Sequence, residues 1–485
     1  MKNLGVILRT GRNLVFWVVV TLLAIQGCRK DDPVSGEYRE INEWILDNMS
    51  FWYLWNTQIP RRTNQTLHPK DYFESLLYKA EDKFSWIQED FTELMNYLSG
   101  VTTEAGYEFQ LFRVEQGSTQ VIGCITYIKP GTPAQAAGLK RGDVFSSING
   151  TAITTGNYQN LLRQISEKHT IGKVDANTGK TTTVSLSVME YKENPIFLDT
   201  IYNIQNKKIG YFVYNFFARD SERTGITYEK ELNDLFGKYQ TQGVDELIID
   251  LRYNSGGTVV TAEALASMVS SRGASDIFGY EIYNSLVDRE LIKLYGKDYN
   301  ITYFPDYIEK SNSSGNVTER VKINKLTNLK QLYLIVTGHS ASASELLINS
   351  LRPYMDVVLV GAATYGKNVG SITIYERDEE KQKTNKWGMQ PIISKFENSL
   401  HFSDYGDGFP PDVPSDEFDF EIELLELGNI DEVMLSDALN HILGIKSLKK
   451  KNVATKPESV GSSLDRFPAR KNMFFETLHF KSVAY

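Results

Sequence analysis

The sequence predicts a multidomain α/β protein, on three observations. Residues 209–213 and 247–251 are continuous apolar runs of strand length, as expected for strands that are buried on both faces. Residues 262–270 and 343–351 have helical patterns, and strands that alternate with helices are typical of a layered α/β core. The length of 485 residues exceeds what one hydrophobic core supports, so roughly two to four domains are expected.

The composition is that of an ordinary globular protein, and it excludes one class of function. Hydrophobic residues make up 41% of the chain and charged residues 23%. The formal net charge of -9 provides no basic surface, which binding to nucleic acid requires. Nucleic-acid-binding proteins are therefore set aside.

The N-terminus has the pattern of an export signal. Basic residues precede the apolar run 14–25, which is too short to span a bilayer comfortably. The run leads into the letters IQGC, which resemble the lipobox of bacterial lipoproteins, with Cys28 as the acylated residue. The resemblance implies a signal peptide over residues 1–27, a lipid on Cys28 and a linker over 28–36.

A lipobox implies that the protein is exported and lipid-anchored to the bacterial envelope, at the outer membrane, facing either the periplasm or the outside. An uncleaved hydrophobic anchor is the alternative, and it also leaves the rest of the chain outside the cytoplasm. The letters RKDD at 29–32 are similar to the acidic export signal of some surface-exposed lipoproteins, and they are equally typical of a charged linker.

The chain contains 2 cysteines, which excludes a disulfide framework and a cysteine-based zinc site. Cys28 is assigned to the lipid, so Cys124 has no partner. Because Cys124 lies in the apolar run 121–125, we expect a small core residue and not a nucleophile.

Residues 37–100 are predicted to form a small helical domain. Apolar residues recur there at spacings of three and four, which marks one buried helix face. The aromatic letters FWYLW at 51–55 continue this pattern. Packing in a helical core is favoured for these rings over a sugar-stacking surface.

Residues 101–192 contain a strand, a Pro-Gly turn, a helix of small residues and a Gly-Asp turn, in the letters KPGTPAQAAGLKRGDVFSSINGTAI. The stretch resembles a PDZ domain of the permuted bacterial protease type. The resemblance places a peptide-binding loop at Gly106, Tyr107 and Phe109, where backbone N–H groups bind the carboxylate of an extended chain end. Glu108 is an unexpected neighbour for an anion.

Residues 193–445 are expected to form the α/β core, and residues 446–485 a tail. The tail is basic and polar, so we expect it to be loosely attached. Local docking of residues 473–475 is the alternative.

The letters GAATYGKN at 361–368 nearly match the sequence motif of a nucleotide-binding loop. That loop needs Ser or Thr after its lysine and a helix beyond it. Here Asn368 follows Lys367, and the alternating run 369–375 predicts a strand. Lys367 is therefore not assigned to a phosphate.

Ser342 lies where the predicted strand 332–336 turns into the helix 343–351, in the letters VTGHSASASELL. A serine at such a turn can present its hydroxyl to a cleft, but it needs a base to become a nucleophile. His339 is one candidate base, and the alternative is that it is an ordinary residue of the turn. Lys367 is the other candidate base, if burial lowers the pKa of its ammonium group. The alternative is that Lys367 is an ordinary surface lysine.

The letters SASASE, followed by TYGKNVG, resemble the C-terminal processing, or tail-specific, peptidase family. Its members are serine peptidases with a Ser/Lys dyad, a crotonase-like layered α/β core and an inserted PDZ domain. The resemblance implies that Ser342 is the nucleophile and Lys367 the base, at the family's separation. It also implies an oxyanion hole formed by the N–H groups of Ala343 and Gly256, with Gly257 as the next candidate, in the turn DLRYNSGG.

The sequence departs from the family at one position. Ser371 stands where many members have a glutamine that orients the lysine, and its hydroxyl can still form a hydrogen bond with Lys367. Glu345 and Thr364 match auxiliary positions. The letters GDGFPPDV at 406–413 match the segment that closes the family's core.

We therefore expect an exported, lipid-anchored serine endopeptidase that cleaves polypeptides through an acyl-enzyme, with PDZ-mediated recognition of substrate chain ends. No metal or cofactor is implied, and the oligomeric state is not predicted. A catalytically inactive, PDZ-containing peptide-binding lipoprotein is the alternative, favoured by the departure at Ser371. A carbohydrate-binding lipoprotein, based on the N-terminal aromatic residues, is a third interpretation.

Overall fold

The computed structural model describes residues 37–475 with internal gaps, which are listed here once: 176, 219, 222–225, 312–316, 419–423, 446–457 and 467–472. The predicted signal peptide, Cys28 and the linker to residue 36 lie outside the described residues. Within the described residues, no helix combines the length and apolar character needed to cross a membrane.

The core begins with a six-stranded sheet. Five of its strands are parallel, and β10 pairs antiparallel at one edge. Its order is β10 (Ile196–Ile204), β11 (Lys207–Tyr214), β14 (Glu246–Asp250), β20 (Gln331–Val336), β21 (Asp356–Gly361) and β26 (Val413–Pro414). The strands β11, β14, β20 and β21 are almost entirely buried, as the continuous apolar runs predict.

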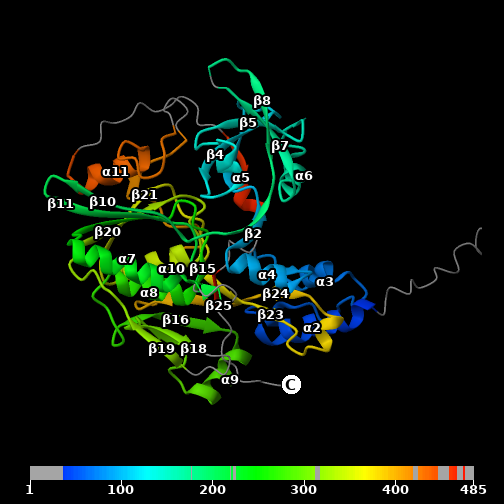
Figure 1. Ribbon diagram of the computed structural model, residues 1–485. Coiled ribbons are helices and arrows are strands. Elements are labelled where there is room, and N and C mark those ends of the chain that lie inside the picture. Colours follow the sequence, from blue (N-terminus) through cyan, green and yellow to red (C-terminus); the bar gives the residue numbers. More distant parts are fainter. Residues whose placement is uncertain are drawn as a thin grey trace, which may run out of the picture.

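Helices separate this sheet from a second six-stranded sheet (Figure 1). The helices are α7 (Tyr228–Gln242), α8 (Val259–Met268) and α10 (Ala343–Leu351), and α11 (Val433–Ile442) covers the opposite face of the first sheet. The order of the second sheet is β15 (Gly257–Thr258), β28 (Met473–Phe475), β22 (Val369–Ile372), β25 (Ile392–Asn398), β16 (Ile277–Tyr283) and β17 (Ile301–Tyr303). The layers place the C-terminal end of β20 and the start of α10 near the middle of the molecule.

A separate sheet forms the PDZ-type domain. Its strands are β3 (Tyr107–Arg113), β4 (Val121–Ile128), β5 (Val144–Ile148), β7 (His169–Val174) and β8 (Thr181–Leu186), with β27 (Ser459–Ser462) on the edge of β3 and β6 (Thr151–Ala152) beside β5. The helices α5 (Pro133–Ala136) and α6 (Tyr158–Gln164) pack on it. Cys124 is buried in β4, which confirms a core residue, and burial raises the pKa of its thiol to about 12.

The N-terminal domain is mainly helical, with α2 (Glu37–Trp52), α3 (Pro69–Leu76) and α4 (Phe91–Leu98). Tyr53 is fully buried and Trp44 and Trp55 pack on the same cluster, which confirms core packing of the aromatic residues. The sequence does not indicate β1 (Trp86–Gln88), which joins this domain to the core through β24 (Gly388–Gln390) and β23 (Ile374–Tyr375).

The remaining elements are short connections. The pair β2 (Val101–Glu104) and β9 (Met189–Lys192) forms the stem of the PDZ domain. The others are the hairpin β12 (Asp220–Ser221) with β13 (Ile226–Thr227), the hairpin β18 (Tyr307–Ser311) with β19 (Val317–Lys322), and α9 (Ser285–Tyr295).

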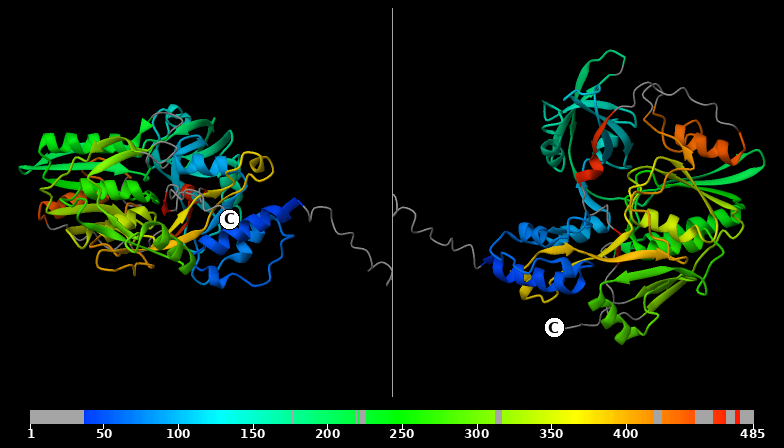
Figure 2. Two further views of the ribbon diagram at one scale, coloured as in Figure 1. Left: turned by 90° about the horizontal axis from the view of Figure 1, so that it is seen from below. Right: turned by 180° about the vertical axis from the view of Figure 1, so that it is seen from behind.

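The strand expected after Lys367 in place of a helix is confirmed as β22, and the run 369–375 divides into β22 and β23 in different sheets. One expectation from the sequence needs correction. The tail is not loosely attached where the structure describes it: β27 joins the PDZ sheet, and β28 joins the second core sheet. Figure 2 shows the red β27 region against the PDZ domain in a second view.

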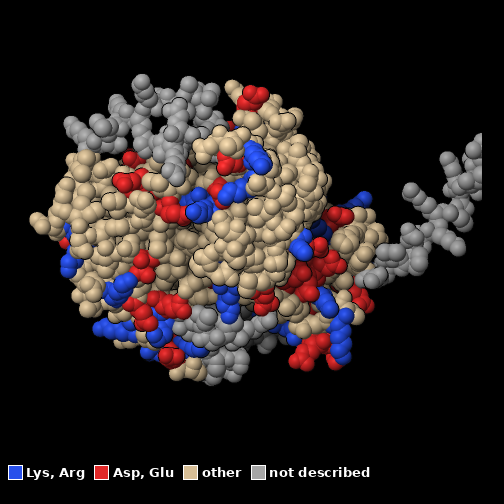
Figure 3. All heavy atoms as spheres, turned by 45° about the horizontal axis from the view of Figure 1, so that its top comes forward, with Lys and Arg blue, Asp and Glu red and all other residues tan. Residues whose placement is uncertain are grey.

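Acidic and basic side chains both occur on the face of the molecule that Figure 3 shows. On that face the mixture of signs is in keeping with the net charge of -9.

Candidate active site

Ser342 lies in the turn between β20 and α10, immediately before the helix. Its backbone has φ 63° and ψ −113°, a conformation that residues other than glycine rarely adopt. The residue is fully buried, and among the described residues its Oγ has no hydrogen-bond partner. A strained turn therefore holds a hydroxyl in a dry site at a helix N-terminus, where developing negative charge is favoured.

Hydrogen bonds join the Ser342 turn to the glycine-rich turn after β14. The Ala341 N–H and the Ser344 Oγ both donate to the carbonyl of Asn254, at 3.1 and 3.0 Å. The Ser340 Oγ donates to the carbonyl of Leu251 at 2.7 Å. Hydrogen bonds therefore hold the two turns together, although Asn254 and Ser342 are 88 positions apart in the printed sequence.

Gly256 has to be a glycine because it touches the serine. With a φ of +114°, a Cβ added there would lie 2.7 Å from the Ser342 Cβ and 3.0 Å from its Oγ. Any side chain at this position would clash with the candidate nucleophile.

The predicted role of Gly256 as the oxyanion donor stays a prediction. In this conformation its N–H donates to the side-chain Oδ1 of Asn254 at 2.9 Å. At Gly257 the geometry is different. The Thr258 N–H donates to the carbonyl of Phe217, and neighbouring residues of a strand direct their N–H groups to opposite sides. The Gly257 N–H is therefore directed away from Phe217, to the side on which β28 pairs with β15 in this conformation.

Lys367 is fully buried at the end of the loop that precedes β22. Burial lowers the pKa of its ammonium group from the ordinary 10.5 to about 7, and the negative charges of Asp82 and Glu345 partly oppose this shift. Its Nζ lies 4.8 Å from the ring centroid of Phe84. A lysine in these surroundings is substantially neutral near pH 7 and can accept a proton.

Glu345 holds the serine and lysine segments together. Its Oε2 accepts the N–H groups of Ser342 and Lys367, both at 2.8 Å. Its Oε1 accepts the Gly366 N–H and the Thr364 Oγ1, both at 2.6 Å. Burial raises the pKa of this carboxyl, and these hydrogen bonds oppose the rise. The two auxiliary residues expected from the sequence, Glu345 and Thr364, thus lie together between the candidate dyad segments.

The other candidate residues are less directly placed. Ser371 is fully buried on β22, and its predicted contact with Lys367 stays a prediction. The ring of His339 lies towards the PDZ domain, because its Nε2 is 3.0 Å from the Gln110 Oε1 of β3. This contact does not favour His339 as the base for Ser342.

The predicted peptide-binding residues offer backbone and not side chains. The rings of Tyr107 and Phe109 are buried in the PDZ core, at 2% and 1% exposure. The Gly106 carbonyl accepts the Lys129 N–H at 2.9 Å. The Phe109 N–H donates to the Oγ of Ser463, a residue of the tail.

The sequence analysis missed two groups of residues. Phe84 and Asp82 come from the N-terminal domain and act on Lys367, yet nothing in their local sequence indicates a site. Arg141, in the KRGD turn of the PDZ domain, reaches the core: it donates to the Tyr253 OH at 2.6 Å and to Glu417 at 2.8 Å. Tyr253 precedes Asn254, so the PDZ domain is joined to the turn that supports Ser342.

Comparisons with known proteins were consistent with this architecture. The family model for the peptidase S41 N-terminal domain matches residues 40–86, that for a PDZ domain matches 124–172, and that for peptidase family S41 matches 208–382. The chain is 24% identical over 419 residues to a "probable CtpA-like serine protease" of Staphylococcus aureus, covering 83% of this chain and 71% of that protein. It is 25% identical over 268 residues to the carboxy-terminal processing protease CtpA of Bacillus subtilis, covering 55% of this chain and 48% of that protein.

A solved structure shows the same fold. A Bacteroides fragilis protein described as an S41 protease superposes with a TM-score of 0.62 at 24% identity, covering 83% of this chain and 98% of that chain. The predicted α/β fold with a PDZ domain and an N-terminal helical segment is confirmed. The chain is therefore similar to members of peptidase family S41 over an N-terminal domain, a PDZ domain and a peptidase core, in that order.

Proposed function

We propose that this protein is a serine endopeptidase in which Ser342 is the nucleophile and Lys367 the general base. One observation carries the proposal. A single carboxylate, Glu345, accepts the backbone N–H groups of a strained serine and of a buried lysine whose pKa is lowered to about 7. A lysine with an ordinary pKa would be a cation near pH 7 and could not act as the base.

The reaction follows from these groups. Neutral Lys367 accepts the Ser342 proton as Oγ attacks the scissile carbonyl, and a tetrahedral oxyanion forms. Ala343 is the first residue of α10, so its N–H has no intrahelical acceptor and is suited to that oxyanion, with the Gly257 N–H as the second donor. The Lys367 ammonium then protonates the leaving amine. After the acyl-enzyme forms, Lys367 deprotonates the water that hydrolyses it.

The PDZ domain supports a polypeptide substrate. Its β3 edge pairs with an extended segment, and Arg141 joins the domain to Tyr253 beside the Ser342 turn. We infer that a segment of the substrate binds this edge while another part enters the active site.

The location of the enzyme is a separate proposal that depends on the sequence alone. The lipobox-like letters before Cys28 favour an exported protein with a lipid anchor in the bacterial envelope. Metabolic labelling with a clickable fatty acid is expected to mark the full chain and not Cys28→Ala. Equal labelling of both would contradict the anchor.

Labelling by a fluorophosphonate separates an enzyme from an inactive peptide-binding lipoprotein. We expect one modified serine in the wild type and none in Ser342→Ala. Ser350→Ala is the matched control, because Ser350 is a buried serine of the same helix without a hydrogen-bond partner among the described residues. Unlabelled wild type that also leaves an unfolded protein intact would favour the inactive alternative. Precursors that accumulate in envelope fractions of Ser342→Ala cells would identify substrates.

A further inference from the structure

The tail supplies one strand to the PDZ sheet and another to the second core sheet. A polypeptide substrate would need to bind at both positions. β27 pairs antiparallel with β3 at the edge of the PDZ sheet. β28 pairs in parallel with β15 on one side and with β22 on the other. Figures 1 and 2 show the red β27 region lying against the PDZ domain from opposite sides.

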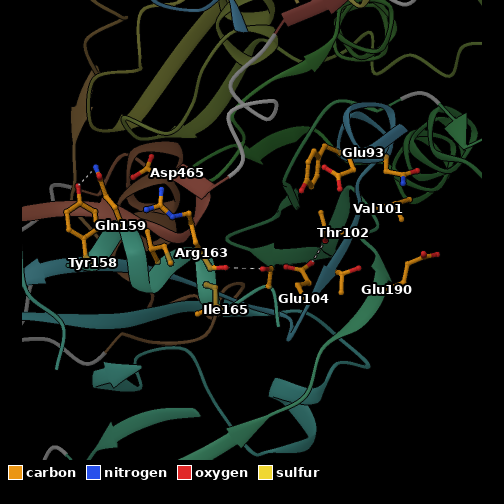
Figure 4. Close-up of a pocket in the computed structure, with 15 residues that line it drawn as sticks. Glu93, Val101, Thr102, Glu104, Tyr158, Gln159, Arg163, Ile165, Glu190 and Asp465 are labelled. Atoms are coloured by element: carbon orange, nitrogen blue, oxygen red, sulfur yellow. Dashed lines mark hydrogen bonds between the residues drawn. The ribbon is translucent and has the colours of Figure 1, made fainter. Parts of the chain in front are cut away.

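The first place is the groove between β3 and α6. A Cβ added at Gly461 of β27 would lie 3.1 Å from the ring of Tyr158 on α6. Beyond β27, the 3-10 turn Ser463–Arg466 contacts α6. Figure 4 shows Asp465 of this turn with Tyr158, Gln159 and Arg163 at the rim of a cavity of about 890 Å³ that all four line. The tail thus occupies the position in which PDZ domains bind extended peptides.

Within this groove, Ser463 takes the position expected for a ligand carboxylate. Its Oγ accepts the Phe109 N–H at 2.8 Å and donates to the Glu108 Oε2 at 2.5 Å. Ser463 and Glu108 are both fully buried. The loop therefore presents a donor and an anionic acceptor to the same atom. A hydroxyl satisfies both, whereas a carboxylate would face the Glu108 carboxylate at hydrogen-bond distance.

The second place is the sheet beside the candidate dyad. Met473 is paired with Gly257, and Phe474 with Ser371. With β28 between them, β15 and β22 are two strand spacings apart, or roughly 10 Å, which is the room that one extended chain fills. β15 follows Gly256, which touches Ser342, and β22 follows Lys367. A substrate strand that brings its carbonyl to Ser342 between these segments needs the same slot.

We propose that the described tail segments, residues 458–466 and 473–475, are an intramolecular ligand that competes with polypeptide substrates at the PDZ groove and at the active-site sheet. The PDZ loop selects an internal strand that carries a hydroxyl, and not the chain-end carboxylate expected from the sequence. This inference rests on the proposed peptidase function for its effect on activity. The proposal that the tail binds in the groove depends only on the contacts in that groove.

The first test uses the full chain with Ser463→Asp, which places a carboxylate beside Glu108. We expect release of the tail, and an increase of at least about fivefold in both fluorophosphonate labelling of Ser342 and cleavage of an unfolded protein. Ser185→Asp is the matched control, because Ser185 is exposed on β8 at the opposite edge of the same sheet. Folded variants whose rates of labelling and cleavage are equal to or lower than those of the wild type would overturn the proposed inhibition by the tail.

The second test measures binding and needs no activity. The protein is the full chain with Ser342→Ala and Ser463→Asp, in which the groove is expected to be open, and the probe is a fluorescent, amidated peptide of residues 458–466 followed by anisotropy. We expect binding that weakens at least about tenfold for the Ser463→Asp peptide and for a peptide ending in a free carboxylate at 463. Equal or tighter binding of either acidic peptide, or no binding of the parent, would overturn the groove assignment. If no form of the enzyme were labelled while the parent peptide bound, the peptidase function would fail and the groove assignment would hold.

Discussion

Lys129 and Lys367 are both fully buried, and the two regions around them differ in charge. At the PDZ stem, the Lys129 Nζ lies 2.7 Å from Glu104, 2.9 Å from Glu108 and 2.9 Å from Glu193. The Lys367 Nζ lies over the ring of Phe84. Three carboxylates favour the charged form of Lys129, whereas burial lowers the pKa of Lys367.

The carboxylates that act on Lys367 are used by other donors. Asp82 accepts the Tyr53 OH and the N–H groups of Phe84 and Ser85, and Glu345 accepts backbone N–H groups and Thr364. Their charges oppose the pKa shift of Lys367 but do not cancel it. Burial therefore favours the neutral form of Lys367, whose neighbouring anions are held by other donors, whereas the carboxylates around Lys129 bind its Nζ directly.

Replacing Lys367 by methionine should have the largest effect. We expect labelling of Ser342 to fall at least about 10³-fold, because the base is lost. Stability should rise below pH 7, by at most about 5 kcal/mol, because the folded protein no longer holds a desolvated charge. The pKa of Lys367 is about 7 in the folded protein and 10.5 ordinarily, so wild type should regain stability relative to the variant as pH rises from 7 to 10.5.

Urea unfolding at pH 6 and pH 10 checks the Lys367→Met prediction, with Lys180→Met on an exposed turn as the control. A variant that is less stable than wild type at pH 6 would show that Lys367 is held as a structural cation, like Lys129.

Replacing Lys129 by methionine should change stability in the opposite direction. Three buried carboxylates would lose their shared cation, and breaking a buried ion pair costs about 3–5 kcal/mol. The measurement is the urea midpoint at pH 7 beside that of Lys367→Met. A Lys129→Met protein that is more stable than the wild type would contradict the role of Lys129 as a structural cation.

The strain at Ser342 predicts a smaller difference between two inactive variants. Ser342→Gly should be more stable than Ser342→Ala by about 1–3 kcal/mol, because only glycine adopts a φ of 63° without strain. Thermal unfolding of both proteins checks this. Equal melting temperatures would mean that the turn stores no strain.

Glu345→Gln should give the smallest effect that is specific to the base. Removing the negative charge that raises the pKa of Lys367 should move the pH midpoint of labelling below about 7, by less than about one unit. Glu380→Gln, an exposed substitution, serves as the control. An unchanged or higher midpoint in Glu345→Gln would exclude this electrostatic coupling.

The candidate dyad was assigned through the family resemblance of the letters SASASE and TYGKNVG, because residue types alone left both His339 and Lys367 open as the base. Glu345 and Thr364 were assigned in the same way, and the structure places them between the Ser342 and Lys367 segments. The role of Gly256 was only partly predictable. A glycine there is expected from its place in the turn, but the choice of Asn254 Oδ1 as the acceptor depends on a side-chain rotamer.

The strands of the tail could not be predicted in the same way. Phe109 and Ser463 are 354 positions apart, and the register of such a pair is set by packing that no local pattern records. The contribution of Phe84 has the same cause, because β1 brings the N-terminal domain to the core through pairing with β24.

The most direct test of Lys367 as the base of Ser342 is the pH dependence of Ser342 acylation by a fluorophosphonate. We expect a rate that rises with pH through one ionisation near 7 in the wild type, and loss of this rise in Lys367→Met. A rate that is independent of pH from 5 to 9, or an ionisation that persists in Lys367→Met, would contradict it.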